Sequence, residues 1–257
     1  MRHRGKVVIV TGGSKGIGRA TCFKFATEGA LVVVNQESNS SNPGLSKEVV
    51  QEIAKVGGQA IAIDADVSVK SEVQSLLDKT IEKFGRLDIM VSNAGICPFE
   101  EFLKIDEELL DKVIGINQKG AFFCSQLAME KMIELNIPGR IIFTSSVSAV
   151  FGGELQTHYC QTKGAVNQLM KSIAIAAGRY GITSNAVQPG TVITDINREE
   201  LEADPDLLKY FIKRTPMRRL ATPEDVANAI CFYASDEASC INGTTLTVDG
   251  GMSVNFQ

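Results

Sequence analysis

The sequence predicts an α/β fold in which about seven parallel strands form one doubly wound sheet with helices on both faces. Short apolar runs alternate with longer segments of helical period, which is typical of βαβ units and a parallel sheet. The runs are nearly continuous in Val, Ile and Leu, as in strands covered on both faces. Gly12, Asn93, Ser146 and Pro189 each follow such a run, at the carboxyl ends of strands where these sheets bind ligands.

The elements follow from this alternation in chain order. Strands are expected at Val7–Thr11, Leu31–Asn35, Ala60–Asp64, Ile89–Ser92, Arg140–Thr144, Thr183–Gln188 and Thr244–Val248. Helices are expected at about 17–28, 45–56, 70–84, 107–136, 158–179 and 223–234. A further helical segment at about 197–213 interrupts the alternation, so residues 191–219 are predicted to cover a substrate. Residues 1–257 are expected to form a single domain, because a hydrophobic content of 44% is ample for one buried core.

Composition excludes several classes of function. The net charge is -4 and Lys and Arg do not cluster, so no nucleic-acid partner is expected. The apolar run Val7–Val10 is too short for a signal-peptide core, and no apolar stretch approaches the roughly 18 residues that span a bilayer. We therefore expect no membrane partner and a cytoplasmic location. The six cysteines form no C-x-x-C pair, so neither a zinc site nor a disulfide framework is predicted.

A glycine-rich segment lies between the first expected strand and the first expected helix. It runs Thr11, Gly12, Gly13, Ser14, Lys15, Gly16, Ile17, Gly18. Glycines at such a place permit a tight turn and let the backbone approach a pyrophosphate at a helix N-terminus. The segment predicts a dinucleotide site in a Rossmann-type sheet, the alternative being an ordinary strand-to-helix turn.

The choice of dinucleotide depends on the end of the second expected strand, Asn35-Gln36-Glu37-Ser38. An acidic side chain there favours a free ribose 2′-hydroxyl, and basic side chains favour a 2′-phosphate. Neutral Gln36, with Lys15 in the glycine loop, favours NADP, whereas Glu37 favours NAD. We predict use of both with NADP preferred. Lys15 is alternatively a solvated charge.

Two further strand ends carry residues suited to a dinucleotide. Asp66 and Val67 follow the third strand, and the Asp66 carboxylate can accept a hydrogen bond from the adenine amino group. Asn93, Ala94 and Gly95 follow the fourth strand. The small residues there let a flat ring lie against the backbone.

Tyr159 and Lys163 are four residues apart, which places both on one face of a helix. A phenol with a pKa of about 10 is a poor base at neutral pH, and a nearby ammonium lowers that pKa. Ser146 follows the fifth strand, so a returning helix can bring the phenol to its hydroxyl. Proton transfer suits Ser146 better than acylation, because neither His158 nor His3 comes with an obvious Ser/His/Asp arrangement.

With these residues identified, the chain resembles the short-chain dehydrogenase/reductase family over essentially its whole length. The matching stretches are Thr11-Gly12-x-x-x-Gly16-Ile17-Gly18, Asn93-Ala94-Gly95, Asn117, Ser146, Tyr159-x-x-x-Lys163, Pro189-Gly190 and Val248-Asp249-Gly250-Gly251. Ser92 stands where many members have a second asparagine. Without the neighbouring motifs, Asn117 reads as a solvent-facing residue of a helix.

The resemblance implies roles in an oxidoreductase that acts on CH–OH groups. Tyr159 would be the general acid/base, Lys163 would lower its pKa and hold the nicotinamide ribose, and Ser146 would hydrogen-bond the reacting oxygen. Asn117 would anchor a water that relays protons through Lys163. These roles agree with the chemistry, because a proton must leave the alcohol as hydride departs to the nicotinamide.

The resemblance further implies a nicotinamide site and an assembly. Pro189 and Gly190 would bind the cofactor, and the Val192 backbone and the Thr194 side chain would hold its carboxamide. A homotetramer would bury the helices at 107–136 and 158–179 in its interfaces.

Several local stretches resemble the sugar 1-dehydrogenases of that family. They are Asn93–Phe99, Gln156–Tyr159, Pro189–Thr191, Thr194–Asn197 and Val254–Gln257. The resulting hypothesis is that β-L-rhamnopyranose is oxidised at C1 to the 1,5-lactone. Ser148, Gln156, Thr191 and Asn197 would bind its hydroxyls, because unpaired polar groups in a closed site are costly. Each could equally be a surface residue.

Two other functions remain open. A 3-oxoacyl thioester reductase of the same family would use the same catalytic residues with an apolar acyl groove, against which Gln156 and Asn197 speak. A non-catalytic dinucleotide-binding protein could lose Ser146, Tyr159 or Lys163 without penalty, yet all three are present.

Overall fold

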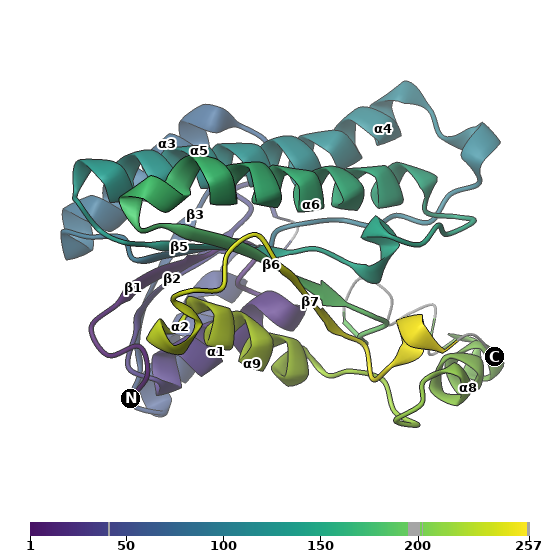
Figure 1. Ribbon diagram of the computed structural model, residues 1–257. Helices are drawn as coiled ribbons and strands as arrows, with labels where there is room; N and C mark the ends of the chain where they lie inside the picture. Colours follow the sequence, from purple (N-terminus) through teal and green to yellow (C-terminus); the bar gives the residue numbers. More distant parts are fainter. Residues whose placement is uncertain (41, 195–200, 202, 256–257) are drawn as a thin grey trace.

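A seven-stranded parallel sheet forms the centre of the molecule, as the sequence predicts (Figure 1). The computed structural model describes residues 1–40, 42–194, 201 and 203–255. The strand order is β3-β2-β1-β4-β5-β6-β7, and all the pairings are parallel. The strands are β1 (Val7–Val10), β2 (Leu31–Gln36), β3 (Gln59–Asp64), β4 (Ile89–Ser92), β5 (Arg140–Thr144), β6 (Thr183–Pro189) and β7 (Thr245–Val248).

The central strands are buried on both faces, which explains their composition. All four residues of β1 and of β4 are buried, as are all seven of β6. Burying one Val, Leu or Ile side chain stabilises a fold by about 1.5–3 kcal/mol relative to leaving it exposed. Continuous apolar runs therefore predict these strands well, and the strand bounds differ from the expected ones by one residue at most.

Two layers of helices cover the sheet (Figure 1). One layer contains α1 (Gly16–Thr27), α2 (Leu45–Lys55) and α9 (Pro223–Ala234). The other contains α3 (Lys70–Phe84), α5 (Gly120–Glu134) and α6 (Thr157–Ala177). Each layer closes its own hydrophobic core against one face of the sheet. None of the described helices is both long and apolar enough to cross a membrane.

The helix expected at 107–136 is interrupted. It consists of α4 (Glu107–Val113), a π-helical segment η2 (Ile114–Lys119) and α5. Single π-helical turns inside α-helices are frequent at functional sites. Asn117 lies in this segment and is only 2% exposed, so its reading as a solvent-facing residue is wrong.

The further helix expected at 197–213 corresponds in part to α8 (Pro205–Arg214). Asp204 caps it, because its carboxylate accepts hydrogen bonds from the Asp206 and Leu207 amides at 3.0 Å each. Residues 195–200 and 202 lie outside the described part of the chain. Short 3-10 helices complete the fold: η1 (Phe102–Lys104), η3 (Val147–Ala149), η4 (Gly178–Tyr180), η5 (Asp236–Ala238) and η6 (Met252–Val254).

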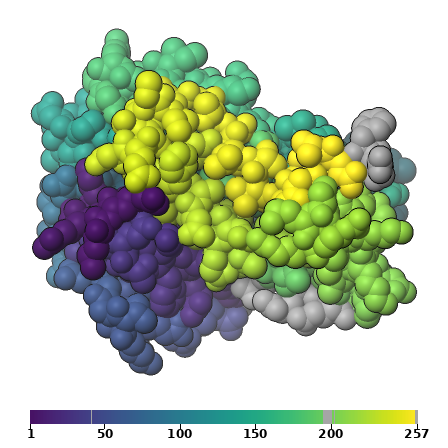
Figure 2. Space-filling view, turned by 60° about the horizontal axis from the view of Figure 1, so that its bottom comes forward, coloured from purple at the N-terminus to yellow at the C-terminus, as the bar shows by residue number. Residues whose placement is uncertain are grey.

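The carboxyl ends of the strands form a crevice, and the opposite end of the sheet is where the N-terminal segment packs. The strand order reverses between β1 and β4, and in such sheets the crevice at the carboxyl ends beside this reversal binds ligands. At the opposite end, the N-terminal segment lies against a late part of the chain, purple beside yellow in Figure 2. The guanidinium of Arg2 there donates to Glu237 at 3.2 Å.

Candidate active site

A cavity of about 1100 Å³ opens at the carboxyl ends of the strands. This volume exceeds the roughly 300–1,000 Å³ of an ordinary ligand pocket, as expected for a site that holds a dinucleotide and a substrate. The expected cofactor residues that line it are Gly12, Ser14, Lys15, Gly16, Ile17, Gly18, Gln36, Asp66, Val67, Asn93, Ala94, Gly95, Pro189, Gly190, Val192 and Thr194. The expected catalytic and substrate residues that line it are Ser146, Ser148, Gln156, Tyr159, Lys163 and Thr191. Asn117 is buried outside this lining, and Asn197 lies outside the described residues.

The glycine loop has the geometry of a phosphate cradle. Gly12 and Gly16 have φ values of +62° and +47°, which favour glycine. A Cβ on Gly18 would lie 2.0 Å from the Gly12 carbonyl oxygen. The N-cap of α1, Lys15, makes no side-chain hydrogen bond to the first turn, so backbone N–H groups of that turn are left for an anion. The residues present therefore fit the pyrophosphate of a dinucleotide.

A hydrogen-bond network fixes this loop to the neighbouring strands. The Thr11 hydroxyl accepts from the Asn93 and Ala94 amides at 2.9 and 3.1 Å. The Asn93 side-chain amide donates to Thr11 O at 2.9 Å, and its carbonyl oxygen accepts from the Thr144 hydroxyl at 3.0 Å. Both ends of the Asn93 side chain therefore bind protein. Asn93 shapes the cofactor site by holding the ends of β1, β4 and β5 together.

Tyr159 and Lys163 lie on the first turns of α6, side by side in the cavity wall. The Lys163 ammonium is 5.4 Å from the centre of the Tyr159 ring and donates to Thr144 O at 2.8 Å. Burial lowers the pKa of Lys163 to about 8. Burial also raises the pKa of Tyr159, and a hydrogen bond with Ser146 only partly offsets this. Lys163 does not reverse that shift, in contrast to the expectation from the spacing.

Asn117 ties the loop after β4 to the helices. Its side-chain oxygen accepts from the Ile96 amide and its side-chain nitrogen donates to Ile96 O, both at 2.9 Å. The same nitrogen donates to the Thr162 hydroxyl at 3.2 Å. A Cβ on Gly95 would lie 3.3 Å from Asn117 Oδ1 and 3.6 Å from Lys163 Nζ. Asn117 and Lys163 thus approach the same glycine from within the fold.

The polar residues expected to bind a substrate surround the same corner of the cavity. Ser146 caps η3, and its hydroxyl accepts from the Ser148 amide at 3.1 Å. Gln156 begins α6 as its N-cap, and its side-chain amide donates to Cys97 Sγ at 3.3 Å. The Thr191 hydroxyl lies 4.0 Å from the Met252 sulfur. These weak contacts with sulfur leave Gln156 and Thr191 able to exchange partners for a polar ligand.

Gln36 lines the cavity, as predicted, and both ends of its side chain also bind protein. Its side chain is buried, its nitrogen donates to Asn42 O at 2.7 Å, and its oxygen accepts from the Ser46 amide at 2.8 Å. Both ends therefore fix the segment that leads into α2. The neighbouring Glu37 and Lys15 are exposed and line the cavity, so both charges are accessible to a ligand there.

Asp66 retains one oxygen for a ligand. Its Oδ1 accepts from the Ser68 amide and hydroxyl at 2.8 and 2.7 Å, while its own amide donates to Glu72 at 2.8 Å. These bonds fix the turn after β3. They are consistent with a carboxylate held at the edge of an adenine pocket.

Sequence reasoning missed an apolar part of the cavity wall. Phe99, Phe151, Leu155, Phe211 and Met252 line it. The loops that carry Phe99 and Leu155 are joined, since the Glu100 amide donates to Leu155 O at 3.0 Å. For Phe99, Phe151 and Leu155, large apolar residues in loops after strands were the available signal, whereas Phe211 and Met252 lie on α8 and η6.

Comparison with known proteins finds relatives that match almost the whole chain. A family model described as enoyl-(acyl carrier protein) reductase matches residues 12–253. The L-rhamnose 1-dehydrogenase (NAD(P)(+)) of Sphingomonas sp. (strain SKA58) is 45% identical over 253 residues, covering 98% of each chain. The L-rhamnose 1-dehydrogenase (NADP(+)) of Thermoplasma acidophilum is 42% identical, covering 99% of this chain and 98% of its own.

The fold is likewise shared with solved structures. The crystal structure of gox2181 superimposes with a TM-score of 0.93 at 31% identity, covering 98% of this chain and 97% of its own. Together with the glycine loop, the Asn93 network and the paired Tyr159 and Lys163, these similarities establish the family. The chain belongs to the short-chain dehydrogenase/reductase family of oxidoreductases.

Proposed function

We propose that this protein oxidises the C1 hydroxyl of L-rhamnose to the corresponding lactone, with NADP or NAD as hydride acceptor. The observation that carries the proposal is the partly buried Tyr159, flanked by polar side chains in a cavity that also holds a dinucleotide cradle. Full-length relatives named L-rhamnose 1-dehydrogenase (NAD(P)(+)) or (NADP(+)) support both the sugar and the cofactors.

The chain's own residues account for the proton transfer. The Tyr159 phenolate takes the proton of the C1 hydroxyl, and the Ser146 hydroxyl hydrogen-bonds the same oxygen. When bound, the oxidised nicotinamide supplies the acceptor for the hydride that leaves C1. The Lys163 ammonium lies 5.4 Å from the centre of the Tyr159 ring, and a positive charge near a phenol favours the phenolate. Asn117, packed against Ile96, positions the water that connects Lys163 to solvent.

The polar corner suits a sugar. Ser148, Gln156 and Thr191 each present a donor and an acceptor in the cavity wall. A site built of such groups rejects ligands that leave them unpaired. Asn197 is proposed as a further partner of the ring hydroxyls, and residues 191–219 as the segment that covers the substrate. Leu207, Phe211 and Arg214 of α8 line the cavity and support that role. The single domain over 1–257 stays a prediction.

The apolar wall favours one second candidate. Phe99, Phe151 and Leu155 offer the surface that the acyl chain of a 3-oxoacyl thioester requires. The same Tyr159 would then donate a proton to the oxygen as the ketone is reduced. A non-catalytic role is disfavoured, because Ser146, Tyr159 and Lys163 are brought together at the cost of burying a lysine.

A substrate comparison distinguishes the two enzymatic candidates. We expect L-rhamnose to reduce NADP or NAD, followed at 340 nm, and acetoacetyl thioester to oxidise NADPH at a much lower rate. Gln156→Leu removes hydrogen bonds to the sugar and is expected to raise KM for L-rhamnose about tenfold. Faster turnover of the thioester than of any aldose in a panel would refute the sugar assignment.

Tyr159→Phe tests the proton transfer. We expect it to lower kcat/KM for L-rhamnose by about 10²–10⁴-fold, since the variant lacks the acid/base group. Cofactor affinity should stay unchanged, measured by the fluorescence of bound NADPH because the chain contains no tryptophan. Tyr180→Phe is the matched control, since Tyr180 is exposed on η4 outside the cavity lining. Wild-type activity in Tyr159→Phe would rule out the mechanism.

The contacts of Gln36 predict how cofactor preference is determined. We expect Glu37→Gln to raise the NADP:NAD ratio of kcat/KM about fivefold to tenfold, because a carboxylate near the 2′-phosphate is removed. Gln36→Leu should weaken both cofactors together, because it frees the segment that leads into α2. A changed ratio in Gln36→Leu with no change in Glu37→Gln would show that Gln36 itself recognises the ribose.

We propose that the chain assembles as a homotetramer through α5 and α6. Phe122 on α5 is 44% exposed and Ile175 on α6 is 85% exposed, and apolar side chains on neighbouring helices suit symmetric contacts. Light scattering should give four chain masses, and Ile175→Glu should lower that mass. A monomeric wild-type chain would contradict the assembly.

The cytoplasm is the proposed location. All six cysteines are free, and unpaired thiols are typical of reducing compartments. Recovery of the activity in a secreted fraction would argue against it.

A further inference from the structure

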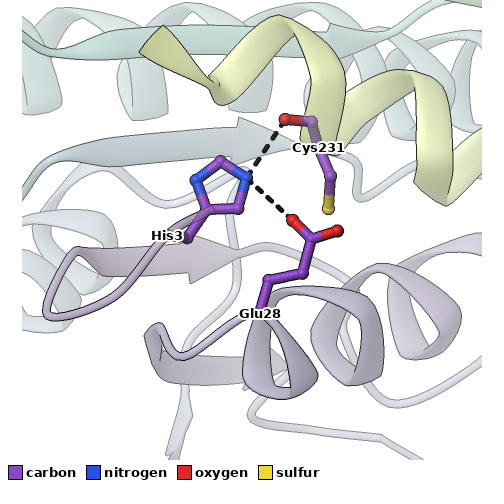
Figure 3. A group of neighbouring side chains, drawn as sticks. All are labelled: His3, Glu28 and Cys231. Carbon is purple, nitrogen blue, oxygen red and sulfur yellow. Dashed lines mark hydrogen bonds and ion pairs between the residues drawn. The ribbon is translucent and has the colours of Figure 1, made fainter. Parts of the chain in front are cut away.

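Three side chains that can ligate a metal meet at the end of the sheet remote from the cavity. His3 precedes β1, Glu28 directly follows α1, and Cys231 lies in the last turn of α9. Figure 3 shows the imidazole facing the Cys231 carbonyl and the Glu28 carboxylate, with the cysteine sulfur on the same side. One donor atom of each residue lies within 4.8 Å of the other two. No spacing motif predicts this cluster, because its members come from three distant parts of the chain.

One carboxylate oxygen of Glu28 points into the cluster without a hydrogen-bond partner. Its Oε2 is buried and unpaired by hydrogen-bond geometry, and it lies 3.3 Å from His3 Nε2. The other oxygen, Oε1, pairs with Lys24 at 2.9 Å and faces Arg2 at 3.8 Å. His3 Nε2 is also 3.1 Å from Cys231 O. Lys24 and Arg2 therefore occupy the outer side of the carboxylate, and Oε2 is left facing inward.

Two helix ends and low exposure favour a cation in the cluster, whereas the nearby Lys24 and Arg2 charges oppose it. The C-terminal ends of α1 and α9 converge there, and helix C-termini carry partial negative charge. His3 is 1% exposed and Cys231 is fully buried, so little water competes for the donors. The Glu28 side chain keeps 15% of its surface exposed, which gives an ion a route from solvent.

We propose that His3, Glu28 and Cys231 bind a zinc ion that ties the N-terminal segment to α1 and α9. An imidazole nitrogen, a carboxylate oxygen and a thiolate sulfur are the ligand types that zinc takes in proteins. Zinc bonds of about 2.0–2.3 Å require donor atoms about 3.3–3.8 Å apart, so modest side-chain movements close the site. Binding releases the Cys231 thiol proton to solvent. The imidazole, whose Nε2–H donates to Cys231 O before binding, then carries its one proton on Nδ1, so that Nε2 is free to ligate the ion.

The site is separate from the proposed catalysis. His3 precedes β1 and Gly12 follows it, so the length of that strand lies between the ion and the cavity. Zinc should therefore stabilise the fold without taking part in sugar oxidation. The inference does not depend on the proposed substrate.

Zinc titration of the tag-free, metal-depleted full chain tests the proposal. We expect calorimetry to give one tight equivalent of zinc per chain. A hundredfold excess over Kd should raise the thermal unfolding midpoint by about 5 °C. Cobalt should give the near-ultraviolet charge-transfer band of a thiolate ligand.

Variants locate the bound ion. Cys231→Ser and Glu28→Gln should each lose the thermal shift, and Cys231→Ser should also lose the cobalt band. Cys124→Ser is the matched control, because Cys124 is a buried cysteine in the opposite helix layer, and it should retain both signals. If Cys231→Ser does not fold, Glu28→Gln and His3→Gln decide the question.

Two outcomes would overturn the proposal. If the wild-type chain does not bind zinc stoichiometrically, His3 serves only to cap α9 through its hydrogen bond to Cys231 O. Zinc binding that persists in Cys231→Ser and Glu28→Gln would assign the ion to another place. The rate of sugar oxidation, followed at 340 nm, should be the same with and without zinc in the wild type. A failure of the aldose assay would therefore leave the zinc result unaffected.

Discussion

The hydrogen-bond chain from the glycine loop to Lys163 is the constraint on which the rest of the site depends. Asn93 binds Thr11 and Thr144 with the two ends of its side chain, and Thr144 O accepts from the Lys163 ammonium. Three strands that are distant in sequence are thereby fixed at one edge. The phosphate cradle and the proton-transfer pair consequently keep a constant separation, which hydride transfer to a bound nicotinamide requires.

Burial of this edge determines its electrostatics. Lys163 is buried, and burial lowers its pKa to about 8. The same burial raises the pKa of Tyr159. Both shifts favour the neutral forms of the two side chains. Without a bound ligand, ionising the pair is therefore costly. A positively charged ligand ring beside the phenol would favour its ionised form, which links ionisation of Tyr159 to occupancy of the site. Through this coupling, the Tyr159 phenolate forms when the hydride acceptor is bound.

Patterns that depend on local chemistry were predictable, and side-chain directions were not. Runs such as Val7–Val10 gave the strands because burial on both faces demands apolar residues. The π-helical segment at Ile114–Lys119 was not predictable, since its position accompanies bonds between Asn117 and Ile96, which is distant in sequence. Gln36 was correctly placed at the cavity, but its side chain turns to Asn42 and Ser46. A sequence gives the place of such a residue on a strand and not the partner it finds.

The two halves of the cavity are built differently, and this explains why the sequence predicts the cofactor more directly than the substrate. The cofactor half consists of backbone and glycines at strand ends, where a Cβ on Gly18 would overlap the Gly12 carbonyl. Only a few residue types satisfy that geometry, so they form a recognisable motif. The substrate half consists of side chains from loops and α8, including Gln156, Thr191 and Phe211. Many combinations of such side chains can fill the same space, so polarity within the cavity, rather than any motif, carries the selectivity for a sugar over an acyl chain.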